Sequence, residues 1–176
     1  MSYYGRTDGD VLELGSFSGG ISLELARRYS GLQLTIADEN RAYTHHLKGV
    51  LSSEGLSGRI RLVDTKLDSL VFADESFDLV ILRGAFFFII ERPVILEEIY
   101  RVMRPLGTAF VGGGYGKDVP QPVIDEIAEE SRVLNDRLGR RRITIEQLRT
   151  ILDLQGLPEK AEIVEEGGVW IVLRKP

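Results

Sequence analysis

With 176 residues, 43% of them hydrophobic, the sequence predicts a single globular domain (residues 1–176) that can bury a full core. The absence of cysteine excludes disulfides, thiol nucleophiles and zinc–thiolate sites. The 27 acidic and 22 basic residues give a net charge of −5, which makes a nucleic-acid partner unexpected. No apolar run approaches the about 20 residues of a membrane helix, and the N-terminus has no signal-peptide pattern, so we expect no membrane insertion and a cytoplasmic location.

The first predicted elements are a strand, a glycine-rich turn and a helix. Residues 11–14 form an apolar run typical of a buried strand, and a helical pattern of Ile21, Leu25 and Tyr29 follows the turn at residues 15–20. Glycine lets a backbone approach a ligand closely, and a helix N-terminus presents unpaired N–H groups. This window therefore predicts a binding site for a nucleotide-like molecule.

Strands and helices continue to alternate along the chain. Each further strand is a nearly continuous apolar run, and each helix has an apolar face at helical spacing. The strands are predicted at residues 32–37, 60–64, 77–82 and 108–112, and the helical faces consist of Tyr43, Leu47, Val50 and Leu51 and of Ile95, Ile99, Val102 and Met103. Apolar strands that alternate with helices are typical of a parallel sheet covered on both faces.

The pattern changes after Gly116. A longer helix comes first, and its apolar positions are Val123, Ile127, Leu134 and Leu138. Residues 144–147 form a capping box that opens another helix. Residues 161–165 and 169–173 then predict two strands joined by a tight turn. We therefore expect an α/β fold whose sheet closes with an antiparallel pair.

Asp38 follows the second predicted strand, at the carboxyl edge where open α/β sheets bind ligands. A carboxylate there can accept hydrogen bonds from both hydroxyls of a ribose. Aspartate is also a preferred N-cap, so the alternative is that Asp38 only caps the following helix. The spacing alone favours neither interpretation.

Two other polar clusters are interpreted as surface features. Four arginines within residues 137–142 could meet RNA or an acidic lipid, but no aromatic residue lies among them for base stacking, so a solvated turn is favoured. His45 and His46 are adjacent, and neighbouring helical side chains point about 100° apart, so we expect no metal site there.

Four segments, in the right order, resemble class I S-adenosylmethionine-dependent methyltransferases, and the resemblance runs from about Asp10 to Pro176. They are residues 11–19, similar to the family's glycine loop; Asp38, at the place of its ribose acid; residues 74–80, before its fourth strand; and residues 96–107, before its fifth. The resemblance implies a Rossmann-like, doubly wound, seven-stranded and mostly parallel sheet with an antiparallel last strand. It also implies S-adenosyl-L-methionine as cofactor and methyl transfer to a small organic molecule, as in the quinone-biosynthesis branch.

The resemblance also implies which residues contact the cofactor. The glycine loop would carry the methionine part through its backbone, and the acid ahead of it would organise the loop. The implied residues are Glu13, Gly15, Ser16, Phe17 and Gly19 at the methionine part, Asp38 with its neighbour Glu39 at the ribose, Lys66 and Leu67 along the adenine, and Arg83 and Gly84 facing the methyl group and the substrate.

The sequence departs from the family pattern in three places. Phe17 stands where the middle glycine of the loop is usual. Lys66 stands where an acid often accepts from the adenine amino group, and since lysine has only donors, backbone groups or Asp68 would have to substitute. Only about ten residues precede the first strand, where relatives usually carry a covering segment. We therefore expect that the chain is a shortened form, that a partner subunit covers the site, as in a homodimer, or that the site stays open.

Two other functions stay open. A dinucleotide-binding domain would need a glycine in place of Phe17, and Glu13 would repel a pyrophosphate, although Asp38 lies at a suitable distance for its ribose. A non-catalytic module for binding or assembly fits the three departures. Against that module, Gly15, Gly19 and Asp38 are all present together.

Arg83 is the main clue to the substrate. A guanidinium at the mouth of an apolar site could clamp a carboxylate or an enolate, and the equal alternative is a salt bridge to Glu91 or another acid. Residues 86–88 are three phenylalanines, at least one of which we expect at a pocket or interface. No general base is identifiable, because the sulfonium methyl of the implied cofactor is already a strong electrophile and a carbon or acidic nucleophile needs little help.

Overall fold

The computed structural model of the chain describes residues 4–16, 19–83, 85–115, 119–137 and 143–176. Phe17, Gly84 and Leu138, and the arginines at positions 140–142, therefore lie outside the described residues, and what the sequence predicts for them stays a prediction.

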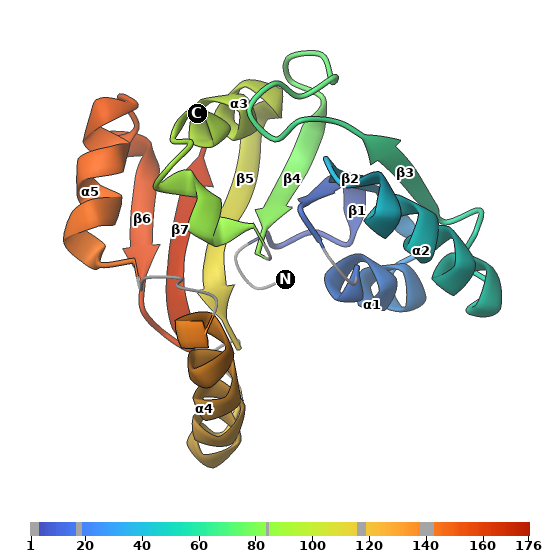
Figure 1. Cartoon of the computed structure of the whole chain (residues 1–176). Coiled ribbons are helices and arrows are strands. Elements are labelled where there is room, and N and C mark those ends of the chain that lie inside the picture. The colour runs from blue at the N-terminus through green and yellow to red at the C-terminus, as the bar shows by residue number, and fades with distance from the viewer. Residues whose placement is uncertain (1–3, 17–18, 84, 116–118, 138–142) are drawn as a thin grey trace.

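In the described residues, seven strands form one sheet in the order β3-β2-β1-β4-β5-β7-β6 (Figure 1). Neighbouring strands are parallel, except that β7 runs antiparallel to both β5 and β6. The strands are β1 (Asp8–Leu14), β2 (Gly31–Asp38), β3 (Ile60–Asp64), β4 (Phe77–Leu82), β5 (Met103–Gly114), β6 (Ala161–Val164) and β7 (Gly168–Arg174). The predicted doubly wound, mostly parallel sheet with an antiparallel last strand is confirmed.

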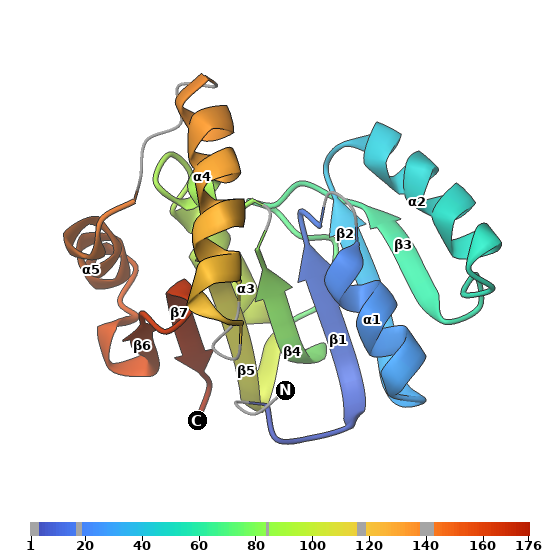
Figure 2. The same ribbon diagram turned by 90° about the horizontal axis from the view of Figure 1, so that it is seen from below.

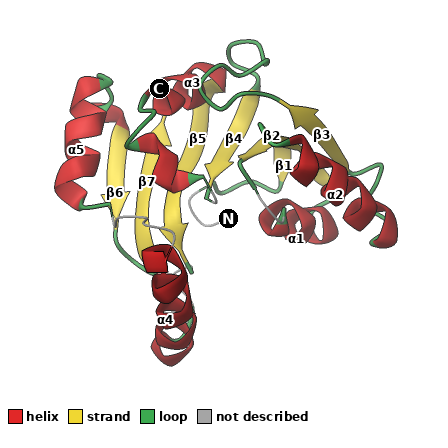
Figure 3. Cartoon of the chain, viewed as in Figure 1, coloured by secondary structure: helices red, strands yellow, loops and turns green. Residues whose placement is uncertain are grey.

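Helices cover both faces of this sheet (Figure 3). They are α1 (Gly20–Arg28), α2 (Arg41–Ser53), α3 (Val94–Val102), α4 (Gln121–Arg137) and α5 (Ile145–Leu154), with short 3-10 helices η1 (Phe86–Ile89) and η2 (Pro158–Lys160). Successive strand residues point to opposite faces, so Val11 packs in a cluster with α1 and α2, while Leu12 packs in a second cluster with α3 and α5. Among the helices described, none is both long enough and apolar enough to cross a membrane.

The boundary between α3 and β5 differs from the sequence prediction. Met103 was expected on the apolar face of the helix, but α3 ends at Val102 and Met103 is the first residue of β5, paired with Phe77 of β4. Pro105 explains the change, because proline restricts the residue before it, Arg104, to extended backbone. Met103 is nevertheless fully buried, as its place in the predicted pattern requires.

The predicted helix after β5 is present as α4, but much of its apolar pattern is not buried. Val123 and Ile127 are each 42% exposed and Leu134 is 57% exposed. Figures 1 and 2 show why: α4 extends from the end of β5 past the edge of the sheet instead of lying along a face. Further along, the predicted capping box is confirmed, with Thr144 and Gln147 exchanging hydrogen bonds at the start of α5.

Asp78 ties together three segments at the amino edge of the sheet. Its carboxylate accepts hydrogen bonds from the backbone N–H of Asp10 (2.8 Å), from Arg6 (2.9 Å) and from Arg104 (2.7 Å). Burial alone would raise the pKa of Asp78, but these hydrogen bonds and the two arginine charges outweigh it and lower the pKa. Asp78 belongs to the 74–80 segment, and its role there is structural.

Replacing Asp78 by asparagine is expected to lower the free energy of unfolding by about 2 kcal/mol, because charged hydrogen bonds are lost. Since the folded pKa is lowered, the stabilisation is present above the unfolded pKa of about 3.9 and is lost as pH falls through the folded value. Urea unfolding from pH 7 down to pH 3 should therefore show the variant and the native chain converging in acid. Asp74→Asn is the matched control, because its exposed pair with Arg101 should contribute less than about 1 kcal/mol.

Candidate functional site

The carboxyl ends of β1, β2 and β4 meet at one edge of the sheet. From the central β1 the chain first builds β2 and β3 on one side, and later β4 and β5 on the other. Open α/β sheets bind ligands at such a switch point. Figure 2 shows β1 and β4 side by side there, with α1 following β1. The predicted residues Gly15, Asp38 and Arg83 each follow or end one of these strands.

The turn after β1 requires glycine at two positions. Gly15 has φ +55°, and a Cβ built on it would lie 2.5 Å from the Cβ of Ala85. Its N–H donates to the carbonyl of Ala37 at the end of β2 (3.0 Å). Gly19, the N-cap of α1, has φ +66°, and an added Cβ would lie 3.0 Å from Leu47. The backbone of this turn is therefore held against β2, α2 and the segment after β4.

Glu13 is buried beneath this turn, with 3% of its surface exposed. One carboxylate oxygen accepts from both the backbone N–H (2.8 Å) and the hydroxyl of Ser22, in the first turn of α1. Gly19 has no side chain to cap the helix, so Glu13 takes over that task from the neighbouring strand. Burial raises the pKa of Glu13, while the Ser22 hydrogen bonds and the Arg83 charge oppose the rise.

Ser16 carries an unsatisfied polar atom. Its hydroxyl oxygen is buried and finds no hydrogen-bond partner among the described residues. Such a group costs free energy unless a ligand or water satisfies it. The hydroxyl is thus suited to bind a polar group of a molecule that enters the turn.

Asp38 ends β2 with 4% of its surface exposed. One carboxylate oxygen accepts from the backbone N–H of Asn40 (2.8 Å), and the backbone N–H of Glu39 also stabilises the charged carboxylate. The alternative that Asp38 caps α2 is wrong, because the N-cap is Asn40, whose side chain accepts from Ala42 (2.9 Å). Burial raises the pKa of Asp38, although the hydrogen bond from the backbone N–H of Asn40 partly lowers it.

Arg92 adds an interaction that the sequence analysis missed. It donates to both carboxylate oxygens of Glu39 (2.8 and 3.0 Å) and lies 3.0 Å from a carboxylate oxygen of Asp68. The hydrogen bonds from Arg92 lower the pKa of Glu39. Glu39 also accepts from the N–H of Leu67 (3.3 Å), so the segments after β2 and β3 are joined. Leu67 is buried, whereas Lys66 is exposed.

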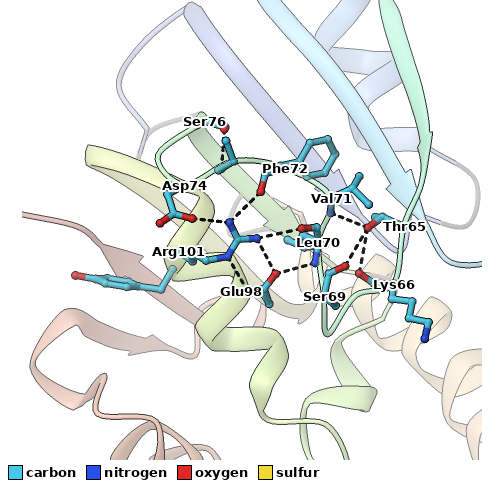
Figure 4. Close-up of polar contacts among 12 residues, drawn as sticks. Thr65, Lys66, Ser69, Leu70, Val71, Phe72, Asp74, Ser76, Glu98 and Arg101 are labelled. Atoms are coloured by element: carbon cyan, nitrogen blue, oxygen red, sulfur yellow. Dashed lines mark hydrogen bonds and ion pairs between the residues drawn. The ribbon is translucent and has the colours of Figure 1, made fainter.

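Two polar centres shape the loop between β3 and β4 (Figure 4). Arg101 of α3 donates to the carbonyls of Leu70 (3.1 Å) and Phe72 (2.9 Å) and pairs with Glu98, which raises the pKa of Arg101. Glu98 in turn accepts from the N–H of Leu70 (2.7 Å). On the other side, Thr65 accepts from the N–H of Val71 (3.1 Å). The segment that contains Lys66 and Leu67 is therefore anchored at both ends.

Within the described residues, Arg83 does not form the salt bridge that was one of its two expected contacts, and the other, a clamp on a ligand carboxylate or enolate, stays a prediction. In the described part of the chain no ion pair joins it to Glu91 or to another acid. Instead, its Nε and Nη2 both donate to the carbonyl of Gly114 at the end of β5 (3.0 and 2.8 Å). Of the three phenylalanines that follow, Phe86 is buried and Phe87 and Phe88 are half-buried.

Metal ligands do not gather in the described residues: no group of three His, Asp or Glu side chains there could hold an ion. His45 and His46 are both exposed on α2. The site therefore consists of a glycine turn with one unsatisfied hydroxyl, two acids after β2 and an arginine after β4.

Comparisons with known proteins show which family this chain resembles. A family model described as a methyltransferase domain matches residues 11–107. A glycine/sarcosine/dimethylglycine N-methyltransferase of Actinopolyspora halophila is 27% identical over 150 residues, 78% of this chain and 26% of that protein. The ubiquinone/menaquinone biosynthesis C-methyltransferase UbiE of Hydrogenovibrio crunogenus is 29% identical over 102 residues, 57% of this chain and 40% of that protein. The chain thus spans less than half the length of these two relatives.

Among solved structures, one from Methanococcus maripaludis assigned as an S-adenosyl-L-methionine-dependent methyltransferase superposes with a TM-score of 0.86. It is 25% identical, and the match covers 99% of this chain and 80% of that one. These matches confirm the predicted resemblance to class I S-adenosylmethionine-dependent methyltransferases. Because the family model covers more than half of the sequence, the chain belongs to the methyltransferase domain family.

Proposed function

We propose that the chain binds S-adenosyl-L-methionine at the carboxyl edge of β1, β2 and β4 and transfers its methyl group to a small organic molecule. One observation carries the proposal: Gly15, Ser16 and Asp38 converge there, with a close backbone, an unsatisfied hydroxyl and a buried carboxylate. The family match favours this function over a dinucleotide-binding domain.

The residues present can contact three parts of the cofactor: the methionine part, the ribose and the adenine. The backbone of the turn at Gly15 and the hydroxyl of Ser16 would hold the polar methionine part. The second oxygen of Asp38 would accept from a ribose hydroxyl, which is a charge-assisted hydrogen bond. The backbone of Lys66 and Leu67 would lie along the adenine, with Glu39 kept in place by Arg92.

Catalysis at such a site requires alignment more than acid–base chemistry. When bound, S-adenosylmethionine supplies a methyl group on a positively charged sulfur, which needs no nucleophilic side chain of the protein. The chain's own contribution would be to orient the acceptor in line with that bond and to exclude water. This role fits the half-buried Phe87 and Phe88 beside the edge.

Four further properties of the chain stay predictions. They are the small-molecule acceptor, a cytoplasmic location, a homodimer that covers the open edge, and the absence of a nucleic-acid partner. The single-domain organisation of residues 1–176 is likewise a proposal. The non-catalytic alternative differs from the main proposal in turnover and not in fold, so cofactor binding and methyl transfer must be measured separately.

Isothermal titration with S-adenosylmethionine, S-adenosylhomocysteine and NAD tests the cofactor. We expect binding of the first two with micromolar dissociation constants and none of NAD. Release of S-adenosylhomocysteine in the presence of small amines, carboxylic acids and quinols then tests turnover. Binding of NAD alone would contradict the proposal, and cofactor binding without turnover across the panel would favour the binding module.

Ser16→Ala is expected to have opposite effects on folding and on binding. Removing a buried hydroxyl that lacks a partner should leave the free energy of unfolding unchanged or slightly higher. Affinity for S-adenosylhomocysteine should fall about 10-fold, corresponding to one lost hydrogen bond of about 1.4 kcal/mol. Thermal melts and titrations on the same samples measure both quantities.

Ser22→Ala is the matched control for that experiment. The Ser22 hydroxyl donates to the buried Glu13, so its removal should lower stability by about 1 kcal/mol. Equal losses of stability in the two variants would mean that the Ser16 hydroxyl is already satisfied in the free protein.

A further inference from the structure

The guanidinium of Arg83 uses only one of its two hydrogen-bonding edges. Its Nε and Nη2 atoms both donate to a single acceptor, the carbonyl of Gly114. A guanidinium offers five N–H groups in a planar fork. The second edge, formed by Nη1 and the remaining proton of Nη2, makes no hydrogen bond within the described part of the chain.

The position of this free edge is fixed by the sheet. Leu82 ends β4, so Arg83 starts at the switch point and leans toward the end of β5. Two hydrogen bonds to one carbonyl restrict the rotation of the long side chain, so little entropy is lost when a ligand binds. Arg83 is exposed, and no described acid lies within ion-pairing distance to neutralise it.

The indole of Trp170, in β7, lies beside Gly114, whose carbonyl Arg83 contacts. Strand pairing places Trp170 opposite Gly112, and its indole Nε1 would lie 2.9 Å from a Cβ built on Gly114. Gly114 therefore has the Arg83 guanidinium at its carbonyl and the indole N–H at its Cα. Glycine at 112 and 114 leaves the room that the indole occupies. Trp170 is also the only tryptophan of the chain, so its fluorescence reports on this spot.

We propose that the free Nη1/Nη2 edge of Arg83 binds a carboxylate beside the position of methyl transfer. The two oxygens of a planar carboxylate match two parallel N–H donors, and such bidentate pairs are both stronger and more directional than single contacts. The carboxylate comes either from the methionine part of the cofactor or from the methyl acceptor. This inference rests on the proposed function, because both sources are ligands of the same site.

Binding of two nucleosides by the native chain and by Arg83→Gln distinguishes the sources. S-adenosylhomocysteine carries the amino-acid carboxylate, and 5′-methylthioadenosine shares its nucleoside but lacks that group. If the cofactor supplies the carboxylate, Arg83→Gln binds S-adenosylhomocysteine 10- to 100-fold more weakly and methylthioadenosine as tightly as the native chain. Arg28→Gln, an exposed arginine paired with Glu24 at the far end of α1, is the control and should change neither affinity.

If the acceptor supplies the carboxylate, Arg83→Gln leaves S-adenosylhomocysteine binding unchanged. Sarcosine and benzoate, added to the S-adenosylhomocysteine complex, should then change Trp170 fluorescence in the native chain but not in Arg83→Gln. Their neutral amides should have no effect in either protein. Arg83→Lys keeps the charge without the planar fork and should recover only part of the loss.

Two results would overturn the inference. In the first, Arg83→Gln keeps full S-adenosylhomocysteine affinity, and neither carboxylate affects the native complex more than its amide. In the second, the variant loses S-adenosylhomocysteine and methylthioadenosine binding equally, which marks a structural role for the bond to Gly114. Failure of the native chain to bind either nucleoside would instead reject the proposed function, and the inference with it.

Discussion

Asp38→Asn is expected to weaken the binding of S-adenosylmethionine about 100-fold, corresponding to about 2.7 kcal/mol for a charged hydrogen bond to the ribose. Asparagine keeps an oxygen that can accept from the N–H of Asn40 (2.8 Å in the native chain), so the end of β2 should stay in place. What is lost is the charge and the second acceptor oxygen. Isothermal titration of native and variant chains with S-adenosylmethionine measures the difference.

Asp153→Asn is the control for this substitution. Asp153 is exposed near the end of α5, on an element that does not contribute to the binding edge, so the same chemical change should leave affinity within error. If Asp38→Asn binds as tightly as Asp153→Asn, the ribose assignment is wrong. If its melting temperature falls with its affinity, the acid is structural.

Gly15→Ala is expected to remove cofactor binding and to lower the free energy of unfolding by about 3 kcal/mol. Part of the loss, about 1–2 kcal/mol, comes from holding a residue with a Cβ at φ +55°. The rest comes from steric overlap, because the added Cβ would lie 2.5 Å from the Cβ of Ala85. Relief of that overlap would move the turn away from the segment after β4, where the methionine part would bind.

Two companion variants separate these causes. Gly49→Ala places the same methyl group in α2, where nothing lies within 4 Å, and should be stabilising by about 1 kcal/mol because alanine favours helix. Gly15→Ala combined with Ala85→Gly removes the overlap but keeps the positive φ, so it should recover part of the stability. Urea unfolding of the four proteins gives the comparison. No recovery in the double variant would assign the whole effect to backbone strain.

The sheet could be predicted because its signals are local. Each predicted strand is a largely apolar run of four to six residues, and Gly15 and Asp38 follow such runs directly in the sequence. The antiparallel pair at residues 161–173 was predictable for the same reason, since two glycines separate two short apolar runs. The parallel pairing and the position of the binding edge then follow from the alternation of strands and helices, whereas the strand order was not predicted.

The interactions that complete the site are not local, and the sequence did not predict them. Arg92 and Glu39 are 53 residues apart, and Arg83 and Gly114 are 31 apart. Nothing in the spacing of these residues indicates that the chain brings them together. For Arg83 the sequence left a ligand carboxylate and a protein acid as equal alternatives, and it gave no sign of the backbone carbonyl of Gly114 that Arg83 contacts.

The apolar pattern of α4 marks another limit. Helical spacing of Val123, Ile127 and Leu134 predicts a helix, and the helix is present. The same spacing normally predicts burial, yet all three side chains are exposed. The periodicity predicts that a helix has an apolar face. Whether other elements pack against that face depends on the fold.

A crystal structure of the chain with S-adenosylhomocysteine tests the central claim most directly. We expect the nucleoside over the ends of β1 and β2, with a ribose hydroxyl within hydrogen-bonding distance of the Asp38 carboxylate and a polar atom of the methionine part hydrogen-bonded to the Ser16 hydroxyl. Density for the ligand at any other place, with the Ser16 hydroxyl still unpaired and Asp38 without a ligand contact, would contradict it.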